Sequence, residues 1–116
     1  MLFIDDDPAV IDATGMLLET EGVELYTAFD GDEALGHLAR GVCPDVVVSD
    51  FRLPKYNGIE AVRRIRSETA SDLPVVLMTG DTGSQAINEA GLRNCTVLHK
   101  PVDTSRLLEL VLAWRG

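Results

Sequence analysis

Val46-Val47-Val48-Ser49-Asp50 is the segment from which the architecture can be worked out, because three consecutive β-branched residues lead directly into a carboxylate. A short apolar run without polar alternation is typical of a strand covered on both faces, as in a parallel sheet. The segment therefore predicts a buried strand that stops at Ser49-Asp50 and leaves Asp50 at the edge of the sheet.

Similar apolar runs occur on both sides of this segment and alternate with longer amphipathic stretches. Such alternation is typical of parallel strands joined by crossover helices, which is an α/β fold. The other predicted strands are Leu2-Phe3-Ile4, Val23 to Phe29, Val75 to Met78 and Val97-Leu98. Five strands and five helices are expected, in one domain over residues 1–116 without linker or repeat.

Polar residues mark where several helices begin. Asp7-Pro8 is expected to start the first helix, and Asp103 to cap the last. Asp30 with Glu33 resembles a capping box at the second helix. The helix from Ser84 to Ala90 has the weakest pattern and follows a loop with small residues at Gly80, Thr82 and Gly83.

The charge balance limits the classes of partner. The chain has 116 residues and a formal net charge of −9, from 10 Lys and Arg against 19 Asp and Glu. Because nucleic-acid affinity comes mainly from cations that contact phosphate, direct nucleic-acid binding is not expected. No apolar run approaches the roughly 20 residues that span a bilayer, and no basic and apolar leader opens the sequence. A cytoplasmic domain without membrane contact is predicted.

The two cysteines are assigned no chemistry. Cys43 and Cys95 lie in different segments and lack the spacing of a metal pair. They are predicted to be buried free thiols.

Polar side chains follow four of the predicted strands. Asp5 and Asp6 follow the first, Asp50 the third, Thr79 the fourth and Lys100 the fifth. The carboxyl ends of parallel strands share one edge of a sheet, where ligand sites form, so these groups should converge. Carboxylates that lie close together repel one another unless a cation offsets their charge. Oxygen ligands suit a hard cation such as Mg²⁺. With a lysine and a hydroxyl beside them, they describe a phosphoryl-transfer site with an aspartate nucleophile.

Each of these residues also has a plain structural interpretation. Asp5 and Asp6 would be favoured at the N-terminus of a helix by its dipole, and Asp50 would fit a turn. Thr79 is a common strand-end residue, and Lys100 would suit any exposed surface. The combination, more than any single residue, favours the functional interpretation.

Four motifs together resemble the response-regulator receiver family of two-component signalling, in order and spacing along essentially the whole chain. They are Phe3-Ile4-Asp5-Asp6-Asp7-Pro8, Val48-Ser49-Asp50-Phe51-Arg52-Leu53-Pro54, Met78-Thr79-Gly80 and His99-Lys100-Pro101. The resemblance implies a flavodoxin-like three-layer sandwich with strand order 2-1-3-4-5.

The resemblance also implies a role for each site residue. Asp50 would be the phosphoacceptor and a Mg²⁺ ligand. Asp6 would bind Mg²⁺ directly, Asp5 through water, and Arg52 through its backbone carbonyl.

On the same resemblance, Thr79 would be the switch hydroxyl, and Lys100 would pair with the phosphoryl group next to a cis Lys100-Pro101 bond. Many family members carry an aromatic residue three positions before the lysine, where this chain has Val97. An aromatic rotamer switch is therefore not expected here.

The implied partners are a histidine kinase or histidine phosphotransfer domain and a downstream output domain or protein. The isolated domain would not be an enzyme, although it would catalyse its own phosphorylation and dephosphorylation. The motifs around Asp50 and Lys100 resemble those of receivers fused to hybrid sensor histidine kinases more than those of transcription factors.

Two alternatives stay open at this point. A Mg²⁺-dependent phosphatase of the haloacid dehalogenase kind also uses Asp-x-Asp, which Asp5 and Asp7 would supply, but it gives Asp50 no role. A degenerate interaction module that is not phosphorylated would be expected to lack the acceptor or the lysine, and both residue types are present.

Overall fold

The computed structural model describes residues 1–80 and 83–115, so Thr82 of the loop predicted before the fourth helix lies outside the described residues. This part of the chain contains five strands and five helices in strict alternation. In chain order they are β1 (Leu2–Ile4), α1 (Pro8–Thr20), β2 (Tyr26–Ala28), α2 (Gly31–Ala39), β3 (Val47–Asp50), α3 (Gly58–Thr69), β4 (Val75–Thr79), α4 (Ser84–Ala90), β5 (Cys95–His99) and α5 (Thr104–Arg115).

All five strands are parallel and form one sheet in the order β2-β1-β3-β4-β5. The central strand β3 pairs Val48 with Phe3 of β1 and with Val76 of β4. The predicted flavodoxin-like fold and strand order are therefore confirmed.

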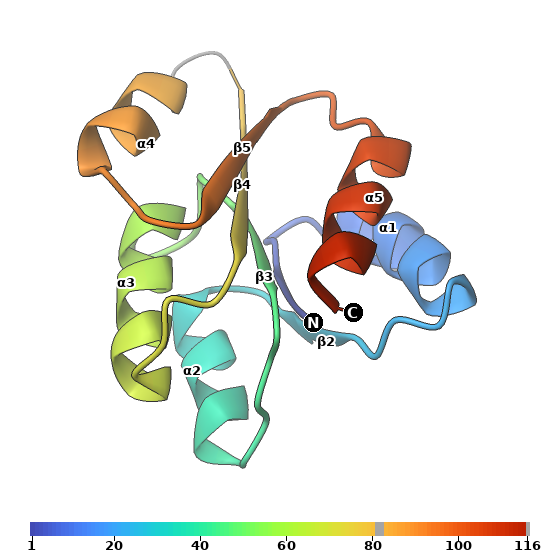
Figure 1. Cartoon of the computed structure of the whole chain (residues 1–116), viewed down its shortest axis with the longest axis horizontal. Helices are drawn as coiled ribbons and strands as arrows, with labels where there is room; N and C mark the ends of the chain where they lie inside the picture. The colour runs from blue at the N-terminus through green and yellow to red at the C-terminus, as the bar shows by residue number, and fades with distance from the viewer. Residues whose placement is uncertain (81–82, 116) are drawn as a thin grey trace.

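Helices cover both faces of the sheet, with α1 and α5 on one face and α2, α3 and α4 on the other (Figure 1). Alternate residues of β3 point into the two layers, since Val47 packs with Val62 of α3 and Val48 packs with Leu107 of α5. Burying a valine contributes about 1.5–3 kcal/mol relative to leaving it exposed. A strand placed between two apolar layers therefore needs the unbroken valine run that the sequence shows.

Helix starts follow the predicted caps. The Asp7 carboxylate accepts a hydrogen bond from the Ala9 amide at 3.0 Å, and Asp103 accepts one from the Ser105 amide at 2.9 Å. Asn57 caps α3 in the same way by accepting from the Glu60 amide at 3.1 Å. A short polar side chain before a helix satisfies amides that have no partner within the helix.

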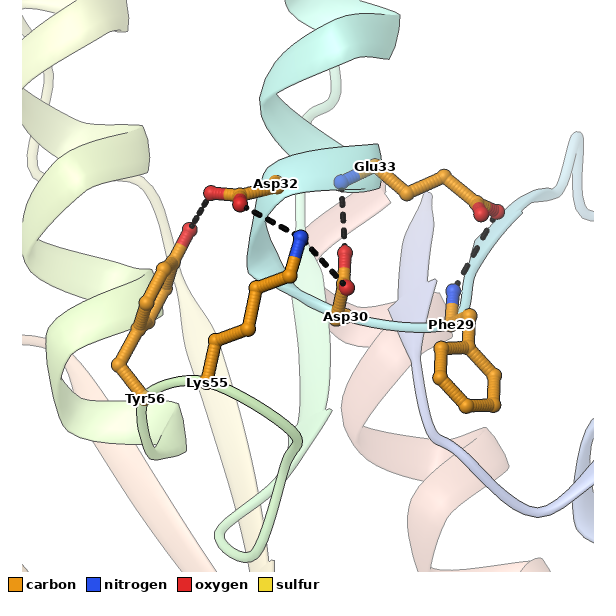
Figure 2. A network of polar contacts seen from close by, with 6 residues as sticks. All are labelled: Phe29, Asp30, Asp32, Glu33, Lys55 and Tyr56. Atoms are coloured by element: carbon orange, nitrogen blue, oxygen red, sulfur yellow. Dashed lines mark hydrogen bonds and ion pairs between the residues drawn. The ribbon is translucent and has the colours of Figure 1, made fainter.

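The capping box at α2 forms only in part. Asp30 accepts from the Glu33 amide at 2.8 Å, as predicted. The Glu33 carboxylate, however, accepts from the amide of Phe29 at 3.3 Å and not from that of Asp30 (Figure 2).

Several strand boundaries differ from the prediction. The predicted strand from Val23 to Phe29 is reduced to Tyr26–Ala28, because the Val23 amide is used by Leu18 at the end of α1 and the Phe29 amide by Glu33. Strand β3 ends at Asp50, as predicted. Strand β4 extends one residue beyond its predicted end, to Thr79, and β5 spans Cys95–His99, where only Val97-Leu98 was predicted.

Both cysteines are free, as predicted. Cys43 is exposed in the connection after α2, so its predicted burial is wrong, whereas Cys95 in β5 is half-buried.

Within residues 1–80 and 83–115, no helix is both long and apolar enough to cross a membrane.

Candidate functional site

The predicted polar residues meet at the carboxyl edge of the sheet. One carboxylate oxygen from each of Asp5, Asp6 and Asp50 lies within 4.8 Å of the others. Asp5 is 1% exposed, Asp50 is 5% exposed, and Asp6 is exposed to solvent. The acidic cluster formed by these three residues is consistent with a metal site.

The strand order places the cluster. Strands β1 and β3 are neighbours, but α1 leaves β1 toward one face of the sheet and α3 leaves β3 toward the other. The two connections therefore diverge directly above Ile4 and Ser49, which pair in the sheet. This is the switch point at which open parallel sheets bind ligands.

Asp5 is the most deeply buried member of the acidic cluster. Its Oδ1 accepts a hydrogen bond from the Asp7 amide at 2.9 Å, while its buried Oδ2 has no hydrogen-bond partner among the described residues. Burial is the main cause that raises the pKa of Asp5, and the nearby Asp50 carboxylate raises it further. A buried carboxylate oxygen without a partner, next to two more carboxylates, is the environment that a hard cation would complete.

Asp50 is held from both sides of its carboxylate. The Lys100 ammonium donates to Oδ2 at 2.9 Å, and the Arg52 amide donates to Oδ1 at 3.4 Å. The Lys100 side chain is 42% exposed, so one end of the ion pair reaches solvent. The backbone between Lys100 and Pro101 is cis, and the Lys100 amide continues the β4–β5 ladder to the carbonyl of Thr79 at 2.7 Å.

Thr79 lies at the end of β4 and is 1% exposed. Its hydroxyl donates to the carbonyl of Gly80 at 3.2 Å, with no hydrogen bond to Asp50. The structure therefore places Thr79 at the same sheet edge as Asp50 but without a hydrogen bond to it.

The close packing of Gly83 against this edge of the sheet was not predicted from the sequence. A Cβ atom on Gly83 would collide with the Thr79 hydroxyl and would lie 2.8 Å from Cδ2 of Phe51. The φ of Gly83 is −90°, which any residue can adopt, so space and not backbone freedom requires glycine here. The only signal in the sequence was a glycine directly before the fourth helix.

Arg52 lies in the connection from β3 to α3 with an exposed side chain. Its amide approaches Asp50, as described above, so its backbone lies beside the acidic cluster. The predicted role of its carbonyl as a ligand stays a prediction.

Asp7 does not join the cluster. It is exposed and caps α1 through the Ala9 amide, and the group of carboxylates that could hold a metal does not include it. The Asp-x-Asp arrangement of the phosphatase alternative is therefore absent from the acidic cluster that the described residues form.

Residues 1–112 match the sequence profile of the response regulator receiver domain. The chain belongs to this receiver family. Its members act in two-component signalling and work with histidine kinases, and as a family they are not enzymes in the usual sense.

The receiver is similar to parts of larger proteins. It is 33% identical over 119 residues to the CAI-1 autoinducer sensor kinase/phosphatase CqsS of Vibrio cholerae, covering 98% of this chain and 17% of that protein. It is 34% identical over 114 residues to the response regulator MprA of Mycobacterium leprae, covering 97% of this chain and 49% of that protein. The receiver thus spans half or less of the length of these two relatives.

Solved structures agree with the fold. The response regulator receiver domain protein of Clostridium thermocellum superposes with a TM-score of 0.86 at 28% identity, covering 97% of this chain and 90% of that one. The response regulator receiver protein of Pseudomonas putida gives a TM-score of 0.84 at 30% identity, covering 97% of this chain and 93% of that one.

Proposed function

We propose that this receiver accepts a phosphoryl group on Asp50 from the phosphohistidine of a histidine kinase or a histidine phosphotransfer domain. The observation that carries the proposal is the surroundings of the Asp50 carboxylate. It is buried at a strand end, paired with Lys100 at 2.9 Å, and set against the carboxylates of Asp5 and Asp6.

The acidic cluster fits Mg²⁺. Carboxylates of Asp5, Asp6 and Asp50 with the backbone carbonyl of Arg52 are the oxygen ligands we propose, and the partnerless Oδ2 of Asp5 supports the choice. When bound, Mg²⁺ would offset the carboxylate charges and those of the incoming phosphoryl oxygens.

In the proposed transfer, a carboxylate oxygen of Asp50 forms the new bond to phosphorus while the bond from phosphorus to the imidazole nitrogen breaks. The electron pair of that bond leaves with the imidazole. Lys100, already on Oδ2, supplies positive charge to the phosphoryl oxygens. Thr79 would donate its hydroxyl to one of them after leaving its present bond to Gly80.

The phosphoryl group brings nearly two negative charges to a buried edge of the sheet. We infer that the receiver reads this change out by altering a surface that binds a downstream output domain or protein. The receiver itself does not bind nucleic acid in this scheme, because its net charge is −9.

We further propose that the parent protein is a hybrid sensor histidine kinase. Similarity to a sensor kinase/phosphatase over 98% of this chain supports this origin. The chain is 34% identical to the response regulator MprA, close to its 33% identity to the sensor kinase/phosphatase. A separate response regulator is therefore the competing origin.

The direct test is to incubate the receiver with Mg²⁺ and acetyl phosphate, and then to locate any added phosphoryl mass by peptide mapping. We expect one label on Asp50 and none when Mg²⁺ is chelated. Asp50→Asn is the matched variant, because an amide has nearly the same shape but is not a nucleophile. Full labelling of Asp50→Asn would contradict the assignment, provided that its circular dichroism matches the wild type.

A further inference from the structure

A group of three polar side chains connects the loop after β3 to the start of α2 (Figure 2). Oδ2 of Asp32 accepts from the ammonium of Lys55 at 2.9 Å, and Oδ1 of Asp32 accepts from the hydroxyl of Tyr56 at 2.8 Å. We call Asp32, Lys55 and Tyr56 the loop clamp. Both oxygens of one carboxylate hold two consecutive loop residues, which fixes the loop at one point of the neighbouring helix.

Each side of the loop clamp is supported by its surroundings. Asp32 lies in the first turn of α2, where the helix dipole favours a carboxylate. The Lys55 ammonium also lies 3.5 Å from Oδ2 of Asp30, the cap of the same helix. The hydrogen bonds from Lys55 and then Tyr56 lower the pKa of Asp32, so it stays an acceptor at neutral pH.

The Tyr56 ring is held from two helices. It fills the space where a Cβ of Gly31 would lie, 2.6 Å from Cζ, so α2 approaches the ring closely. The Arg64 guanidinium of α3 lies 4.1 Å from the centre of the ring. Burial, followed by the bond to Asp32, raises the pKa of Tyr56 to about 12. The phenol therefore remains a donor throughout the neutral range.

The same loop carries the backbone beside the acidic cluster. It leaves β3 at Asp50, passes through Arg52, whose amide donates to Asp50, and enters α3 after Asn57. Lys55 has a φ of 72°, a left-handed conformation that few residues other than glycine adopt. Contacts from Lys55 and Tyr56 to Asp32 therefore fix a bend that the local sequence does not favour.

We propose that the loop clamp positions the Arg52 backbone for Mg²⁺, with Asp32, Lys55 and Tyr56 acting as positioning residues that do not touch the ion. A loop already held in its bound shape loses less conformational freedom when the ion binds, so the affinity is higher. The inference rests on the Mg²⁺ site proposed above.

Tyr56→Phe is the sharpest test because it removes one hydroxyl and no charge. We expect the Mg²⁺ dissociation constant from titration calorimetry to rise about 2- to 5-fold, the scale of one lost hydrogen bond. We also expect faster hydrogen exchange at the amides of residues 52–56 in metal-free protein. Tyr26→Phe is the matched control, since its hydroxyl also donates to a carboxylate, that of Glu24, at 2.8 Å.

A second variant, Asp32→Ala, removes both clamp contacts, and we expect a larger loss of Mg²⁺ affinity than in Tyr56→Phe. Unchanged affinity and loop exchange in Tyr56→Phe, with normal binding by the wild type, would overturn the loop clamp and leave the proposed function standing. An equal loss in Tyr26→Phe would overturn it as well. Absence of Mg²⁺ binding in the wild type would instead contradict the proposed function.

Discussion

Lys100 and Asp50 form an ion pair with an Nζ to Oδ2 distance of 2.9 Å, although Asp50 ends β3 and Lys100 follows β5, two strands that are not neighbours in the sheet. Strand β4 lies between β3, which carries Asp50, and β5, which leads into Lys100. The lysine therefore reaches across the end of β4, over Thr79. Its charge bears on the stability of the acidic cluster and on the proposed transfer.

Removing this charge should affect both properties. Lys100→Met is expected to lower the free energy of unfolding without Mg²⁺ by about 1 kcal/mol, because the lysine is partly exposed and solvent screens the pair. The rate of labelling by acetyl phosphate should fall by roughly 100-fold, the scale for one lost donor at a developing charge. Urea unfolding and intact-mass time courses measure the two effects. Arg106→Met, the same charge change at an exposed position of α5, is the control, and an equal loss there would contradict the roles given to Lys100.

Asp5→Asn should stabilise the metal-free receiver at neutral pH. The folded pKa of Asp5 is raised above its ordinary value of 3.8, so the folded state favours the protonated form. The contribution of protonated Asp5 to the free energy of unfolding is fully present below pH 3.8 and is lost as the pH rises through the raised folded-state pKa. The variant, which imitates the protonated acid, should match the wild type near pH 3 and exceed it at pH 7.

Urea unfolding over this pH range measures the difference, and saturating Mg²⁺ should reduce it because the ion favours the carboxylate. A constant difference at every pH would show that ionisation of Asp5 is not its cause.

Asp6→Ala should weaken Mg²⁺ binding and phosphorylation together while changing stability little, because Asp6 is exposed yet belongs to the acidic cluster. We expect the Mg²⁺ dissociation constant to rise at least about tenfold, as for loss of a supporting group at a metal site. Asp12→Ala, an exposed carboxylate on α1, controls for net charge. Equal Mg²⁺ affinity in the Asp6 variant and the wild type would remove Asp6 from the ligands.

Gly83→Ala should disturb Thr79 by a steric clash and not by straining the backbone. The new Cβ would collide with the Thr79 hydroxyl, and we expect a loss of about 1–3 kcal/mol in the free energy of unfolding, typical of overpacking. Gly80→Ala is the control, since a Cβ there meets nothing within 4 Å. Wild-type stability of Gly83→Ala, measured by urea unfolding, would mean that α4 can move away from Thr79 at little cost.

We expect the phosphorylation signal to leave the receiver through α4. Val97 is half-buried and has no ring to reorient, and a cavity of about 110 Å³ lies beside it, lined also by Ile87 and Gly91. Hydrogen exchange with and without beryllofluoride, which imitates the phosphoryl group, should show changed protection between Ser84 and Ala90. Changes limited to the immediate neighbours of Asp50 would contradict this route.

Much of the fold was predictable because its causes are local along the chain. The valine run before Asp50 needs apolar cover on both faces, and caps such as Asp7 and Asp103 satisfy amides two or three residues away. The edge of the sheet that carries the site follows from the parallel strand directions, so Asp5, Asp6, Asp50, Thr79 and Lys100 could be placed there from the sequence.

Tertiary structure alone decided contacts between side chains of different elements. Lys100 and Asp50 are 50 residues apart, and the loop clamp joins residues 23 and 24 positions apart, from Asp32 to Lys55 and Tyr56. Gly83 looked like an ordinary loop glycine until the packed structure showed the Thr79 hydroxyl against it. Periodicity and capping report the face and the end of one element. The contacts between atoms of two different elements depend on the position in which each helix packs against the sheet. Only the folded chain determines that position.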